Sequence, residues 1–116
     1  MTELNDAEAM EILRSGELPG RLREAAERVA LVLSQSWCPQ WLAMKLWLGR
    51  LAGEEHGLKV YFLEYDRKPY FQEFMEHKET VFQNDLVPYL RYYREGRFLG
   101  DSNFCFKEGF LDQFGN

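Results

Sequence analysis

A short apolar run that leads into a cysteine and a proline constrains this chain more than any other feature. Residues 29–33 (VALVL) are too few for a helix and suit a strand that is buried on both faces. A polar stop follows, and then Cys38 and Pro39. Proline is favoured in the first turn of a helix, and strong helix formers come after it. We therefore predict a helix over 39–52 with Cys38 at its amino-terminal cap.

The order of the other apolar runs and turn residues predicts a sheet with helices on both faces. The strand, helix and strand that come first imply a parallel pair with a right-handed crossover. A later hairpin adds antiparallel strands, so the residues predict a mixed four-stranded α/β sheet. The other expected elements are helices over 6–14 and 21–27, a strand over 58–65, a helix over 66–78, strands over 89–93 and 98–99, and a closing helix over 106–114.

Length and composition predict one self-sufficient domain. The chain has 116 residues, which is enough for one compact domain and too few for two. Apolar residues make up 46% of the chain, so a core can form without a metal or a disulfide framework.

Charge excludes two classes of partner. The net charge is -5 with no Lys or Arg block, so we expect no nucleic acid and no anionic membrane as a partner. No stretch approaches the ~18 apolar residues of a membrane span, and the first residues are acidic rather than signal-like. We therefore expect a cytoplasmic protein in which Cys38 and Cys105 are both free thiols.

Three motifs resemble the thioredoxin family when taken in order. The first is the apolar strand that runs into Trp37-Cys38-Pro39-Gln40-Trp41 and then a helix. The second is Val87-Pro88 ahead of a strand that turns at Gly96, and the third is the closing helix, 107–112 (KEGFLD). The likeness covers roughly residues 20 to 114. It implies a thioredoxin-like fold of four or five strands and a single domain over 1–116, with 1–20 as a helical extension at the amino terminus.

The resemblance also implies a monothiol variant. Trp41 stands where thioredoxins carry their second cysteine, so the usual disulfide cannot form at this motif. Val32 stands where they bury an acidic residue, which removes the proton relay of dithiol exchange. Monothiol glutaredoxins also keep only the first cysteine, but they follow it with Gly-Phe-Ser, whereas this chain has Pro39, Gln40 and Trp41.

Cys38 is the expected catalytic residue. Unpaired backbone N–H groups and the helix dipole favour a negative charge at a helix amino terminus, and the thiolate is the reactive form of cysteine. We expect this thiol to be exposed. The resemblance implies a cis bond before Pro88, which brings the Val87 backbone beside the thiol, where it can pair with an extended peptide or glutathione. The other residues expected to line this groove are Trp37, Pro39, Gln40 and Trp41.

We therefore expect a monothiol thioredoxin-like protein. Cys38 exchanges with a protein disulfide or forms a mixed disulfide with a low-molecular-weight thiol. Glutathione is then a co-substrate, and no metal or other cofactor is expected. A docking module without catalysis is the alternative, and iron–sulfur delivery by a dimer through two Cys38 thiolates is a third. This interpretation is also compatible with a homodimer.

Two other kinds of residue are expected to be structural. Cys105 lies near the start of the closing helix, which we expect to lie away from the active end, so core packing is its default role and pairing with Cys38 the minor alternative. His56 and His77 have no second ligand at metal spacing, so we expect both on the surface.

Overall fold

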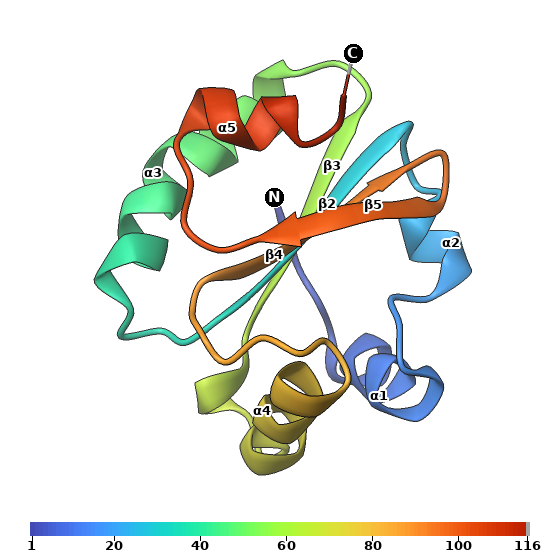
Figure 1. Ribbon diagram of the computed structural model, residues 1–116, viewed down its shortest axis with the longest axis vertical. Coiled ribbons are helices and arrows are strands. Elements are labelled where there is room, and N and C mark those ends of the chain that lie inside the picture. Colours follow the sequence, from blue (N-terminus) through green and yellow to red (C-terminus); the bar gives the residue numbers. More distant parts are fainter. Residues whose placement is uncertain (116) are drawn as a thin grey trace.

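The computed structural model describes residues 1–115 and is built around one mixed sheet of five strands in the order β1-β3-β2-β4-β5 (Figure 1). Strands β1, β3 and β2 are parallel to one another, while β4 runs antiparallel to β2 and β5 antiparallel to β4. The register pairs Leu31 with Tyr61 across β2 and β3, and Val32 with Leu90 across β2 and β4. The strands are β1 (Thr2–Glu3), β2 (Arg28–Ser34), β3 (Leu58–Glu64), β4 (Tyr89–Arg94) and β5 (Arg97–Ser102).

Helices cover both faces of the sheet. Helices α1 and α4 lie on one face, and α3 and α5 lie on the other (Figure 1). Among residues 1–115, no helix combines the length and the apolar character needed to cross a bilayer. The helices are α1 (Asp6–Ser15), α2 (Gly20–Arg23), α3 (Pro39–Glu54), α4 (Phe71–Thr80) and α5 (Lys107–Asp112), with a single 3-10 turn, η1 (Tyr65–Arg67), between β3 and α4.

Alternation along the strands divides the apolar residues into two cores, one on each face. On β4, Tyr89 and Tyr93 join the core under α1 and α4, whereas Leu90 and Tyr92 join the core under α3 and α5. Successive side chains of a strand point to opposite faces, so this division follows directly from the sequence pattern. Strand β2 contributes to both cores and is buried along nearly its whole length, as the apolar run of 29–33 predicts.

The amino-terminal segment contains the predicted helix, as α1, but it also adds a strand to the sheet. Residues Thr2–Glu3 form the edge strand β1, and Leu4, Ala9, Ile12 and Leu18 are buried in the core under α1. A strand of two residues is too short to leave a periodic signal in the sequence. The first 20 residues are therefore part of the packed structure.

Two polar residues of α4, His77 and Lys78, are buried, although such residues are more often found on the surface. His77, expected on the surface, packs edge-on against Phe82 at 4.8 Å between ring centroids. Lys78 is also buried, and its Nζ donates a hydrogen bond to the Asn84 carbonyl at 2.7 Å. His56 is exposed, as expected. Phe82 and Asn84, in the segment after α4, cover His77 and Lys78. The spacing of residues within the helix does not reveal this cover.

Candidate functional site

Cys38 sits where β2 ends and α3 begins. It is the N-cap of α3, and Pro39 occupies the first helical position, as the sequence predicts. The Cys38 carbonyl accepts the first helical bond from the Leu42 N–H at 3.0 Å, while the Cys38 N–H donates to the Gln35 carbonyl at 3.1 Å. The turn between β2 and α3 is thus closed by backbone bonds on both sides of the cysteine.

Asp66, in the 3-10 turn η1 that follows the neighbouring strand β3, anchors this turn. Its carboxylate accepts two hydrogen bonds from Ser36, one from the backbone N–H at 2.8 Å and one from the hydroxyl at 2.7 Å. Gln35 adds a bond to the Tyr65 hydroxyl at 3.3 Å. Sequence analysis missed Asp66. One signal could have found it, because β2 and β3 are parallel and the residues after their carboxyl ends must meet at one edge of the sheet.

The sulfur of Cys38 is less accessible than we expected. The residue is 4% exposed, so the expectation of an exposed thiol is wrong in this structure. The sulfur makes no capping hydrogen bond to the backbone of α3 and instead lies 3.7 Å from the Val87 carbonyl oxygen, to which the S–H can donate. The side chain of Cys38 is part of the core under α3 and α5, and the Val87 carbonyl lies against its sulfur.

The segment opposite the thiol has the expected form. The peptide bond between Val87 and Pro88 is cis. Val87 is half-buried and Pro88 is buried. The Val87 carbonyl faces Cys38, while the Pro88 carbonyl accepts a hydrogen bond from the Asn103 side chain at 2.9 Å. This segment therefore contacts the Cys38 turn on one side and the β5–α5 loop on the other.

Three of the four residues expected to line the groove are exposed beside Cys38. Trp37 is 61% exposed, and its indole N–H donates to the Gln35 side chain at 2.6 Å, which fixes the ring over the turn. Pro39 and Gln40 are also exposed. They offer a partner both apolar and polar contacts.

Trp41 differs from its expected role in the groove because it is fully buried. Its indole N–H donates to the Glu64 carboxylate at 2.8 Å, and Lys45 donates to the same oxygen at 2.8 Å. Burial acts to raise the pKa of Glu64, but the hydrogen bonds from Lys45 and Trp41 outweigh it and hold the pKa below its ordinary value. The spacing of the buried residues of α3 could have revealed this, because Trp41 begins the inward stripe that continues at Met44, Leu48 and Leu51.

The interior beneath Cys38 is apolar. Val32 is fully buried in the same core as Cys38, at the position where the resemblance places an acidic residue in thioredoxins. No group of three or more Cys, His, Asp or Glu side chains within residues 1–115 could hold a metal ion. The side chains packed beneath Cys38 are therefore apolar contacts rather than ionisable groups.

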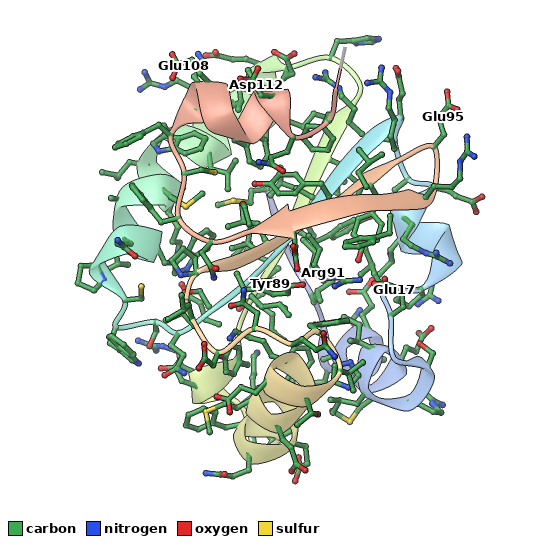
Figure 2. The ribbon with its side chains drawn as sticks, viewed as in Figure 1. Glu17, Tyr89, Arg91, Glu95, Glu108 and Asp112 are labelled. Atoms are coloured by element: carbon green, nitrogen blue, oxygen red, sulfur yellow. The ribbon has the colours of Figure 1, made fainter. Side chains whose placement is uncertain are left out.

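A charged network lies on the other face of the sheet, under α1 and α4. Figure 2 labels three of its members, Glu17, Tyr89 and Arg91, near the centre of the molecule. The Arg91 guanidinium donates to the Glu17 carboxylate at 2.6 Å, to the Tyr89 hydroxyl at 2.8 Å and to the Tyr93 hydroxyl at 3.0 Å. It is also flanked by the rings of Phe82 and Phe98, at 4.0 and 4.1 Å. The sheet separates this network from the core that contains Cys38, so we assign it a structural role.

The β5–α5 loop lies closer to the site than we expected. Cys105 is half-buried and packs against the core that contains Cys38. Two residues earlier, Asn103 donates to the Pro88 carbonyl. The loop before the closing helix therefore reaches Pro88, whereas the first residue of α5, Lys107, lies beside the second half of α3. The antiparallel pairing of β4 and β5 brings the residues after β5 beside those before β4.

Cys38 lies outside the cavity between α1 and α2. This cavity has a volume of about 710 Å³ and is lined by residues such as Met10, Arg14 and Arg23.

Comparison with known proteins places this arrangement in one fold. No family model matches the sequence, and no curated protein matches it. Solved structures do match. Thioredoxin f from spinach chloroplast has a TM-score of 0.66 at 18% identity, over 97% of this chain and 88% of that chain. Mitochondrial thioredoxin 3 from Saccharomyces cerevisiae has a TM-score of 0.67 at 12% identity, over 98% and 92%.

A thioredoxin from Fasciola hepatica matches in the same way, with a TM-score of 0.65 at 10% identity over 98% of this chain and 96% of that chain. The alignments cover nearly the whole of both chains, so the likeness is one of the overall fold. The mixed five-stranded sheet agrees with these neighbours, and we conclude that this protein has the thioredoxin-like fold.

Proposed function

We propose that Cys38 is a nucleophilic thiol that exchanges with a protein disulfide or forms a mixed disulfide with a low-molecular-weight thiol such as glutathione. The observation that carries the proposal is the position of its sulfur, at a strand-to-helix junction and 3.7 Å from the Val87 carbonyl ahead of Pro88. An ordinary core cysteine needs no such setting.

The reaction begins when the Cys38 thiolate attacks one sulfur of a disulfide R–S–S–R′. A Cys38–S–S–R bond forms, and R′–S⁻ leaves and takes up a proton from water, which balances the proton that Cys38 lost. The thiolate is the attacking species, so the rate depends on how readily the protein stabilises it.

The backbone beside Cys38 supports recognition of an extended partner. Val87 lies just before β4. Within residues 1–115, its N–H donates no hydrogen bond to a backbone carbonyl of a turn, loop or helix cap. An extended peptide could therefore pair with Val87 as a short additional strand. Trp37, next to Cys38 in the chain, and Leu86, next to Val87, are large exposed apolar side chains that could contact such a peptide.

A docking module without catalysis is the second candidate, and one observation favours it. Cys38 is only 4% exposed, so a disulfide can reach the sulfur only if the surrounding turn opens or the attack comes along a narrow approach. In that case the exposed Trp37 and Leu86 would bind a partner while the thiol remained part of the core.

The discriminating experiment compares the reactivity of Cys38 in the folded and the unfolded chain. The Cys105→Ser variant leaves Cys38 as the single thiol and is treated with glutathione disulfide, with and without denaturing urea, across a range of pH. Intact mass and peptide mapping follow the adduct. We expect one glutathione on Cys38, formed faster in the folded chain, and none in the Cys38→Ser/Cys105→Ser control. Slower modification in the folded chain at every pH would favour the docking module.

A further inference from the structure

The β5–α5 loop is fastened to the segment that faces Cys38. Asn103 and Asn84 form a reciprocal side-chain pair, with N–H···O distances of 3.0 and 2.9 Å. Asn103 also donates to the Pro88 carbonyl at 2.9 Å. In Figure 1 the loop that leaves β5 and the segment that enters β4 lie at the same end of the sheet. Asn103 is therefore held beside Pro88, and the rest of the loop continues from this point.

The turn that carries Cys38 and the loop that carries Cys105 both contact this segment. Cys38 contacts the Val87 carbonyl, and Cys105 follows Asn103 by two residues. Both side chains pack against the core under α3 and α5, so both sulfurs lie on the same face of the sheet. Both are free thiols in this structure.

Trp41 makes a local partner for Cys38 impossible. It occupies the place of the second cysteine of a Cys-x-x-Cys motif, and it is fully buried and bonded to Glu64. The sequence contains two cysteines in all, so an internal partner for Cys38 can only be Cys105.

Cys105 has a hydrogen-bonding partner that suits a reactive thiol. Its sulfur lies 3.6 Å from the Tyr92 hydroxyl, which is also 2.8 Å from the Ser102 hydroxyl. Burial raises the pKa of Tyr92 above its ordinary value, so the hydroxyl stays protonated and can donate to sulfur.

We propose that Cys105 resolves the mixed disulfide formed on Cys38, so that the chain carries a redox pair contributed by the Cys38 turn and the β5–α5 loop. This inference rests on the proposed function of Cys38. The Cys105 thiolate attacks the Cys38 sulfur of Cys38–S–S–R, a Cys38–Cys105 bond forms, and R–S⁻ leaves and is protonated.

Over both steps the substrate disulfide gains two electrons and becomes two thiols, while the two cysteines lose two electrons. An external dithiol, or two molecules of glutathione, then reduces the internal bond. Because a disulfide requires closely approaching Cβ atoms, the loop from Asn103 to Phe106 must shift toward Cys38 when the bond forms.

The test compares wild type with Cys105→Ser after treatment of both reduced proteins with glutathione disulfide at low protein concentration. We expect wild type to end as a monomer that has lost two hydrogens, with a Cys38–Cys105 cross-linked peptide and no bound glutathione. We expect Cys105→Ser to keep glutathione on Cys38. Cys105→Ala serves as a second variant, and near-ultraviolet circular dichroism checks that each variant is folded.

The outcomes separate the two proposals. A stable glutathione adduct on Cys38 of wild type, at the level seen in Cys105→Ser, overturns the role of Cys105 and leaves the proposed function of Cys38 intact. A Cys38–Cys105 bond between two chains also overturns the internal pair. If neither protein acquires glutathione or the cross-link, both proposals fail.

Discussion

Replacing Glu17 with glutamine tests whether the buried charged network holds the amino-terminal segment to the sheet. Glu17 lies between α1 and α2, and its carboxylate accepts hydrogen bonds from Arg91 and Tyr93. Figure 2 shows Glu17 and Arg91 close together. Glutamine keeps the size of the side chain, but it removes the charge and turns one acceptor into a donor that faces the donors already present.

The expected loss follows from the burial of both partners. The Arg91 side chain is 9% exposed and the Glu17 side chain 29%, so Arg91 would keep its charge with little water to solvate it. Breaking a buried pair from one side costs about 3–5 kcal/mol, and the partial exposure of Glu17 places this case near the lower end, at about 3 kcal/mol. At about 4 °C per kcal/mol for a domain of this size, the unfolding midpoint should fall by about 12 °C.

The assay is urea unfolding at neutral pH, followed by circular dichroism, with calorimetry for the midpoint temperature. Glu11→Gln is the matched control, because Glu11 also pairs with an arginine at 2.6 Å, but Arg21 is 58% exposed. We expect the control to leave the midpoint nearly unchanged. A loss for Glu17→Gln below about 1 kcal/mol, or one equal to that of the control, would refute the reasoning.

Two further predictions concern the unfolding free energy. His77 is buried with no partner for its Nε2, and burial lowers its pKa from the ordinary 6.5, so below about pH 6.5 the unfolded chain binds a proton that the folded chain does not. Stability should therefore fall as the pH drops from 7.5 to 5.5 in urea titrations, and His77→Phe should flatten this slope; an unchanged slope would contradict it. Gly96 has a φ of +81°, and an added Cβ would lie 2.7 Å from the Glu24 Cγ, so Gly96→Ala should cost at least about 1–2 kcal/mol. Gly53→Ala, where an added Cβ meets nothing within 4 Å, should be neutral or slightly stabilising in the same assay, and equal effects at the two positions would argue against the steric reason.

The sequence determined the position of Cys38 and the framework around it. An apolar run too short for a helix, followed by a polar stop and Pro39, specifies a buried strand that leads into a helix, because proline fixes the first turn and lacks the N–H that a helix interior needs. Alternation on β4 likewise specified that Tyr89 and Tyr93 face one core and Tyr92 the other. These are properties of neighbouring residues, so local sequence is sufficient to predict them.

Only the tertiary structure decided how accessible the thiol is and what surrounds it. The low exposure of Cys38, the contact with Val87 and the anchoring of its turn by Asp66 all join segments that lie far apart in the chain. The same holds for the approach of the Cys105 loop to Pro88. A hydrophobic pattern specifies which side of an element is buried, but it does not specify which element covers it. That choice depends on how the strands pair and the helices pack, and it determines what a thiol at the end of β2 can reach.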